Sequence, residues 1–147
     1  MKIALDAKTV TRLIEGEPPR LRERMDEAQA AGDSLFMSSL VLHDLAYSAM
    51  ISEQAARRLA QLDTFIARVE VVAWTSEDAL TAARLRADHE KQHGRPIKLD
   101  PIELLCAAQA LNNDWAVVSE RPPLPFDFAV ITVLGLRTID WSTPSGD

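Results

Sequence analysis

The first candidate for chemistry is Asp6, which ends the short apolar run Ile3–Leu5 in the opening stretch MKIALDAKTV. The run predicts a buried strand over residues 2–6. A carboxylate at the end of such a strand is costly unless a cation, a helix N-terminus or a bound metal pairs with it. Ligands of open α/β sheets gather at the carboxyl ends of the strands. Asp6 is therefore a candidate ligand or catalytic group.

A second carboxylate, Asp44, lies within a helix predicted over residues 39–50. Leu40 and Val41 precede it by one turn and Tyr47 follows by one turn, so its face of the helix is largely apolar. We expect the Asp44 side chain to point into the protein. The alternative is an aspartate held by a nearby hydroxyl or arginine.

The third carboxylate, Glu103, belongs to PIELLCAAQALNN, a segment that is apolar nearly all round and predicts a buried helix over residues 101–112. Asp100 and Glu103 also fit a helix start, with aspartate at the N-cap, Pro101 at the first position and glutamate at the third. Capping alone would explain Asp100. Glu103 could serve as both cap and ligand.

Three carboxylates brought together from different elements repel one another, so they imply a shared cation. Oxygen donors, only three histidines and a single cysteine favour Mg²⁺ or Mn²⁺ over zinc. Such a cation activates water and neutralises the charge that develops on a phosphodiester. A cluster of three carboxylates around such a cation therefore points to phosphodiester hydrolysis.

The charge of the chain limits how it could bind nucleic acid. A net charge of −6 argues against a broad basic face, but residues 84–98 carry five Lys or Arg against two acids. Arg84, Arg86 and Lys98 in this segment are candidate contacts to an RNA backbone. The default interpretation is a solvated helix face.

The predicted elements alternate between strands and helices. After the first strand we expect helices over 8–15 and 19–31, a strand at SLFMSS, helices over 39–50 and 53–67, a strand over 69–74, helices over 76–94 and 101–112, and strands over 115–119 and at the end of VITVLGLRTIDW. This alternation predicts an α/β fold with a mostly parallel sheet covered on both faces.

One domain over residues 1–141 is expected from the length, with 142–147 as a disordered tail. The apolar runs are too short to span a bilayer, so no membrane association is expected. The aspartate in MKIALDAK comes too early for a signal peptide. The lone Cys106 fits a reducing cytoplasm, and we expect it to be a small core residue.

The string HEKQH places His89 and His93 one helical turn apart with Glu90 between them, the pattern of a zinc metalloprotease. No histidine follows to complete a three-histidine site, and the apolar stripe of the helix ends before the motif. Histidines near a helix C-terminus also interact favourably with the helix dipole. We keep the zinc protease as a less favoured alternative.

The segments together resemble a known family. In order and spacing, the chain is similar to the PIN domains of VapC-type toxins over almost its whole length, through IALDAKTV, MSSLVLHDLAYSA, LRADHEKQHGRPI, ELLCAAQA, WAVVSE and VLGLRTIDW. The resemblance implies a three-layer α/β/α sandwich and a Mg²⁺- or Mn²⁺-dependent endoribonuclease site that cleaves RNA. It also implies a homodimer and inhibition by a cognate antitoxin.

By this resemblance, Asp6 matches the first aspartate of the family. Asp44 falls where a glutamate is usual, and Glu103 falls where an aspartate is usual. The loop before Asp100 is about two residues longer than in the family pattern, so either Asp100 or Glu103 could face the site.

Two basic residues depart from the pattern. Lys8 replaces a common asparagine, and Arg121 takes the position of the fourth acidic or amide residue. Either could form ion pairs with the carboxylates and close the site to metal. The alternative function is therefore a catalytically weakened protein that binds RNA or an antitoxin without cutting.

Overall fold

A computed structural model describes residues 1–98, 100–118 and 135–142. In these residues five strands form one parallel sheet with the order β3-β2-β1-β4-β5. The strands are β1 (Lys2–Leu5), β2 (Ser34–Ser38), β3 (Glu70–Val72), β4 (Ala116–Val118) and β5 (Arg137–Ile139). The predicted parallel α/β sheet is confirmed. Because β1 is central, Asp6 follows a strand with neighbours on both sides.

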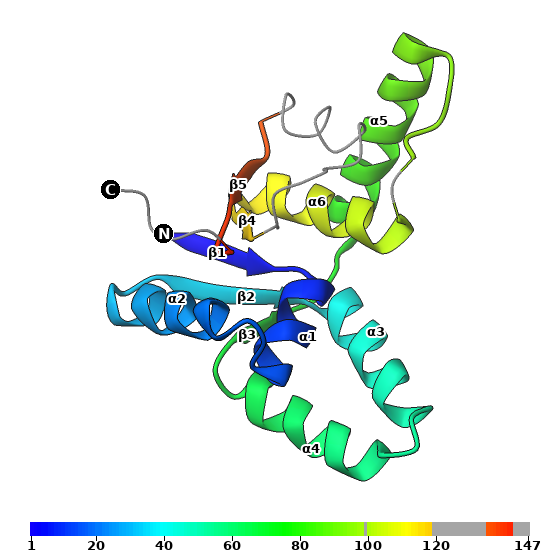
Figure 1. Cartoon of the computed structure of the whole chain (residues 1–147). Helices are drawn as coiled ribbons and strands as arrows, with labels where there is room; N and C mark the ends of the chain where they lie inside the picture. The colour runs from blue at the N-terminus through cyan, green and yellow to red at the C-terminus, as the bar shows by residue number, and fades with distance from the viewer. Residues whose placement is uncertain (99, 119–134, 143–147) are drawn as a thin grey trace.

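Six helices connect the strands (Figure 1). They are α1 (Ala7–Glu15), α2 (Pro19–Ala30), α3 (Ser39–Met50), α4 (Ala55–Ile66), α5 (Ser76–His93) and α6 (Pro101–Asn113). Each lies within about two residues of its predicted range. The helix ends follow local chemistry: Thr75 and Asp78 form a capping box at the start of α5, and Gly94 ends it in the left-handed conformation.

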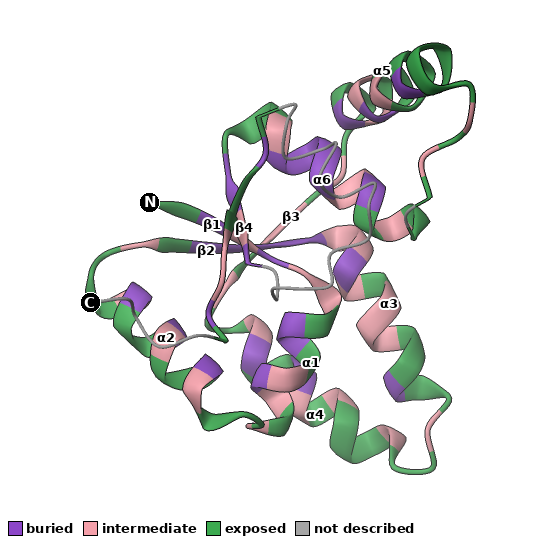
Figure 2. Ribbon diagram, turned by 45° about the horizontal axis from the view of Figure 1, so that its top comes forward, coloured by how far each residue is buried: buried purple, intermediate pink, exposed green. Residues whose placement is uncertain are grey.

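The sheet is buried on both faces, which confirms the three-layer sandwich. Alternate residues of β1 point to opposite sides: Ile3 and Leu5 pack with α1, α2 and parts of α3 and α4, whereas Ala4 packs with α6. On the α6 side, Phe36 stacks on Trp115 with ring centroids 4.7 Å apart. Figure 2 shows the buried residues concentrated where the helices meet the sheet.

Two parts of the molecule extend away from the sheet. The α3–α4 hairpin projects on one side and α5 on the other, with α5 packed along α6 (Figure 1). The buried Asp78 carboxylate of α5 accepts a 2.8 Å hydrogen bond from Asn112 of α6, which joins the two helices.

No helix of the described ranges is long and apolar enough to cross a membrane. Two sequence-based expectations lie outside these ranges, namely Arg121 with its neighbouring loop, and residues 143–147 of the predicted tail.

Candidate functional site

Asp6 joins β1 to α1. It is the N-cap of α1, and its Oδ1 accepts a hydrogen bond of 2.7 Å from the backbone N–H of Thr9. The Asp6 side chain therefore has a helix N-terminus as a partner, which is one of the three kinds of partner that the sequence predicted for it. Burial nevertheless raises the pKa of Asp6, although the Thr9 hydrogen bonds and the charges of Lys8 and Arg12 oppose the rise. The carboxylate is thus incompletely compensated by its protein surroundings.

Glu103 and Asp100 lie at the first turn of α6. Asp100 is the N-cap, and its Oδ1 accepts hydrogen bonds from Ile102 N (2.9 Å) and Glu103 N (3.3 Å). The predicted capping role of Asp100 is confirmed. Glu103 is exposed by surface area, yet enough protein surrounds it that loss of hydration is the largest cause of its raised pKa, followed by the negative charges of Asp100 and Asp6. Glu103 and Asp6 therefore share one negative region, although they are about a hundred positions apart in sequence.

Asp44 differs from its prediction. Its side chain is 45% exposed, and Tyr47 on the same face of α3 is also exposed, so Asp44 does not point into the core. Its nearest ion-pair partner in the described residues is His43, whose Nδ1 lies 3.7 Å from Asp44 Oδ1. The apolar composition of this face misled the sequence analysis, because the α3–α4 hairpin extends away from the sheet and leaves part of the helix uncovered (Figure 1).

The Cys106 thiol is affected by all three carboxylates. The thiol has its pKa raised to about 12, mainly by burial and further by the negative charges of Asp6, Asp44 and Glu103. A hydrogen bond with the Ser38 hydroxyl acts in the opposite direction. Because charge effects of this kind decline with distance, the three carboxylates lie on the same side of the molecule as this thiol. That their oxygens meet at one metal site stays a prediction.

Two residues of this region, Ser38 and Cys106, were not predicted from the sequence to lie near the candidate site. Ser38 ends β2 and caps α3, accepting a 3.2 Å hydrogen bond from Leu40 N, and it is buried. The signal that could have found Ser38 is the one used for Asp6, a polar residue at the carboxyl end of a buried strand. Cys106 gave no such signal, because a small residue in an apolar helix is typical of a core.

Lys8 is close enough to Asp6 and Glu103 to change the pKa of both carboxylates. Its positive charge lowers the pKa of Asp6 and of Glu103, although burial raises both by more. Lys8 itself is exposed on the first turn of α1. The region therefore contains a cation of the protein beside two of its three candidate ligands.

The described residues contain no group of three or more His, Cys, Asp or Glu side chains placed to hold a metal ion as they stand. The donor chemistry nevertheless fits Mg²⁺ or Mn²⁺, because the candidate groups are carboxylates and two of them are destabilised in the charged form.

The HEKQH segment ends α5. His89 is buried, whereas Glu90 and His93 are exposed. The burial of His89 was not expected, because the apolar stripe of the helix ends before it. In the described ranges no third His, Cys, Asp or Glu is placed to hold a metal ion together with these histidines, which leaves the zinc protease alternative without structural support.

The basic candidates Arg84, Arg86 and Lys98 are all exposed. Arg84 and Arg86 lie on α5, and Lys98 lies in the connection from α5 to α6. Arg84 donates a 3.4 Å hydrogen bond to Thr81 on the same helix. These side chains therefore belong to the part of the molecule that carries Glu103, but not to the carboxylate group itself.

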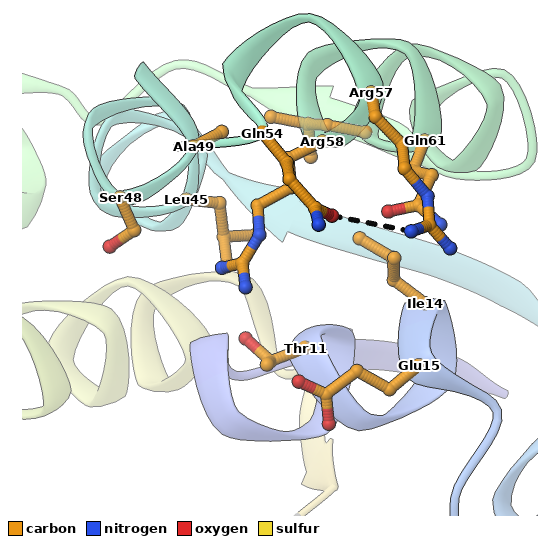
Figure 3. Close-up of a pocket in the computed structure, with 11 residues that line it drawn as sticks. Thr11, Ile14, Glu15, Leu45, Ser48, Ala49, Gln54, Arg57, Arg58 and Gln61 are labelled. Atoms are coloured by element: carbon orange, nitrogen blue, oxygen red, sulfur yellow. Dashed lines mark hydrogen bonds between the residues drawn. The ribbon is translucent and has the colours of Figure 1, made fainter. Parts of the chain in front are cut away.

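A pocket of about 440 Å³ opens between α1, α3 and α4 (Figure 3). It is lined by Thr11, Ile14, Glu15, Leu45, Ser48, Ala49, Gln54, Arg57, Arg58, Gln61 and Leu62. Figure 3 shows the α1 side chains on one side and those of α3 and α4 on the other, with Arg57 donating to Gln54 Oε1 at 3.2 Å. The lining is mostly polar, with two arginines on α4 and one carboxylate on α1, and its apolar side chains are Ile14, Leu45, Ala49 and Leu62.

The sequence of this chain is similar to known proteins over nearly its whole length. The profile of the PIN domain matches residues 3–120. The tRNA(fMet)-specific endonuclease VapC of Shigella flexneri is 30% identical, over 97% of this chain and 99% of the relative. The protein of the same name from Salmonella typhimurium is 28% identical, over 96% of this chain and 98% of the relative.

The fold of this chain is also similar to solved structures over nearly its whole length. A chain of the DNA-bound VapBC complex from Salmonella typhimurium matches with a TM-score of 0.80 and 28% identity, over 96% of this chain and 98% of that chain. A chain of VapBC2 from Rickettsia felis, bound to a promoter DNA fragment, matches with a TM-score of 0.82 over 96% and 99%. At 21% identity the second match shows the fold alone.

Proposed function

Because this chain belongs to the PIN domain family, we propose that it is a divalent-metal-dependent endoribonuclease of the VapC toxin type. It hydrolyses RNA phosphodiester bonds and is one component of a toxin–antitoxin pair. The observation that carries the proposal is the match to the PIN domain over residues 3–120, with Asp6 at the carboxyl end of the central strand β1. The names of the relatives support the same reaction class.

In this proposal, Asp6, Asp44 and Glu103 hold Mg²⁺ or Mn²⁺ through their carboxylate oxygens, with Asp100 as a further candidate ligand. The bound cation supplies charge neutralisation at the phosphate and a more acidic water. Thr9 fixes the orientation of Asp6 through its 2.7 Å hydrogen bond, so Asp6 would be held in place at the end of β1 when it binds the cation. Asp100 fixes the start of α6, and so the position of Glu103, through its two N-cap hydrogen bonds.

Lys8 favours a second candidate function, a binding module with weakened metal affinity. Its charge already stabilises the ionised forms of Asp6 and Glu103, which are the forms that a metal requires. A cation of the protein beside two ligands repels an incoming dication and lowers its affinity. Arg121 is proposed to act in the same direction.

A Mn²⁺ titration by calorimetry on wild type and Lys8→Asn separates these functions. If the enzyme function holds, wild type binds Mn²⁺ and cleaves small structured RNAs only with divalent metal, and Asp6→Asn loses the cleavage. Binding that appears only in Lys8→Asn would instead support the binding module. Equal cleavage in the presence of a chelator would refute the metal-dependent nuclease altogether.

Arg84, Arg86 and Lys98 are proposed to contact the RNA backbone. Each phosphate contact makes binding more dependent on salt. The triple replacement by glutamine should weaken RNA binding and reduce the slope of log affinity against log salt, while leaving Mn²⁺ binding unchanged. An unchanged slope would remove these residues from the RNA site.

The pocket between α1, α3 and α4 is the proposed docking site for the antitoxin. Its apolar side chains, Ile14, Leu45 and Leu62, suit an apolar side chain of a peptide, and Arg57 and Arg58 suit a flanking carboxylate. Met50 and Ile51, at the C-terminal end of α3 shortly after the lining residue Ser48, are exposed apolar side chains that extend this surface. A charged RNA backbone would gain little from Met50 and Ile51, so a protein partner is favoured over nucleic acid here.

Co-purification with the cognate antitoxin tests the docking site. Arg58→Glu should weaken the complex at least tenfold, whereas Arg86→Glu, the same charge change on α5, should not. Equal effects of the two variants would indicate general electrostatics and refute the pocket assignment. A homodimer is also proposed, and light scattering that finds only monomer at high concentration would contradict it.

A further inference from the structure

Two histidines at the end of α5 form a pair that the proposed nuclease function does not use. The rings of His89 and His93 have centroids 4.5 Å apart and are tilted by 35°. His89 is 3% exposed, whereas His93 is on the surface. The four-residue spacing places both on one face of the helix, where two imidazoles can approach the same atom.

The hydrogen bond of His89 shows which of its two ring nitrogens is available to bind a metal. Its Nδ1 lies 3.1 Å from the backbone carbonyl oxygen of Arg95, which can only accept, so Nδ1 carries the proton in this contact. In the neutral ring Nε2 then holds the lone pair. Nε2 is buried and has no hydrogen-bond partner in the part of the chain that the structure describes.

A buried acceptor without a donor is unusual, because most buried polar atoms are satisfied. The arrangement is, however, the one found in metal-binding histidines, where one ring nitrogen donates to a carbonyl and the other faces the metal. His93 supplies a second imidazole at the required spacing, and as an exposed side chain it can change rotamer to bring its nitrogen beside Nε2 of His89.

We propose that His89 and His93 form a two-histidine site for a divalent transition-metal cation that prefers nitrogen ligands, such as Ni²⁺, Cu²⁺ or Zn²⁺. Water completes the coordination, because the described residues supply no third protein ligand. The site lies at the C-terminal turn of α5, where the helix dipole favours a cation. It is separate from the carboxylates, whose oxygen donors suit Mg²⁺ or Mn²⁺.

Occupancy of this site would stabilise the connection between α5 and α6. The ion would fix the ring of His89, and Nδ1 of the same ring holds the backbone of Arg95. The segment that begins at Arg95 leads to Asp100 and Glu103 at the start of α6. The site is thus structural: it orders the segment that precedes a candidate catalytic helix.

Ni²⁺ titration of the full chain by calorimetry, with excess Mg²⁺ to occupy oxygen sites, tests the proposal. We expect one Ni²⁺ per chain and a thermal midpoint that rises with Ni²⁺. His93→Gln should weaken binding at least tenfold and abolish the thermal shift. Because His93 is exposed, this variant should fold like wild type.

Two matched variants complete the test. His43→Gln removes the remaining histidine of the chain, and Glu90→Gln removes the acid of the HEKQH string; both should bind Ni²⁺ like wild type. Equal binding by wild type and His93→Gln would overturn the proposal. Loss of binding in Glu90→Gln or His43→Gln would also overturn it, because the ligands would then be different.

Discussion

Asp6 provides the sharpest test of the site, because its carboxylate is predicted to lower the stability of the fold. Burial raises the pKa of Asp6 above its ordinary value of 3.8. The folded state therefore binds this proton more tightly than the unfolded state does. The stability that Asp6 contributes is complete below pH 3.8 and is lost as the pH rises through the folded pKa. At pH 7 the ionised group is less stable in the fold than in the unfolded chain.

Asp6→Asn should consequently be more stable than wild type at pH 7. Asparagine keeps an Oδ1 acceptor for the Thr9 N–H, now 2.7 Å from Asp6, and it is equally good as an N-cap. Asp6→Ala also removes the charge but loses the cap, which costs about 1 kcal/mol. The alanine variant should therefore unfold about 1 kcal/mol more easily than the asparagine variant, or about 2–4 °C lower for a chain of this size.

Urea unfolding of the three proteins at pH 7 and pH 4 provides the measurement. The advantage of Asp6→Asn over wild type should shrink as the pH is lowered from 7 to 4, because the raised pKa makes the folded state take up the Asp6 proton at a higher pH than the unfolded state does. Asp63→Asn, at an exposed position of α4, is the control and should show little change. An asparagine variant less stable than wild type at pH 7 would refute the reasoning, since Lys8 and Arg12 would then outweigh burial.

Three further predictions concern packing and reactivity. Trp115→Ala should cost about 3–5 kcal/mol in urea unfolding, because the indole is buried and stacks on Phe36; a loss below 1 kcal/mol would contradict this packing. Asn112→Ala should cost about 1.5–3 kcal/mol, because it leaves the buried Asp78 carboxylate without its 2.8 Å donor. Unfolding that matches wild type would show that the bond is dispensable. The Cys106 thiol, with a pKa of about 12 against an ordinary 9.0, should react with iodoacetamide at pH 8 roughly 10³-fold more slowly than in urea-unfolded protein. Comparable alkylation rates in the two states would rule out such a shift.

The sequence alone predicted the local structure of this protein well. The strand at residues 2–6 follows from its apolar run, and the start of α6 follows from Asp100 and the next three residues. These features depend on groups within a few positions of one another, so a short window of sequence contains their physical cause. The parallel sheet was also predictable, because helices separate nearly all of its strands.

Tertiary structure decided how the candidate site is assembled. Cys106 looked like an ordinary core residue, and only the folded chain brings its thiol within electrostatic reach of Asp6, Asp44 and Glu103. Asp44 was expected inside and is half exposed, whereas His89 follows the end of the apolar stripe and is nevertheless buried. Periodicity shows which residues share a helix face, but not whether another element covers that face. That depends on contacts between segments distant in sequence, such as α5 against α6, and these form only when the chain folds.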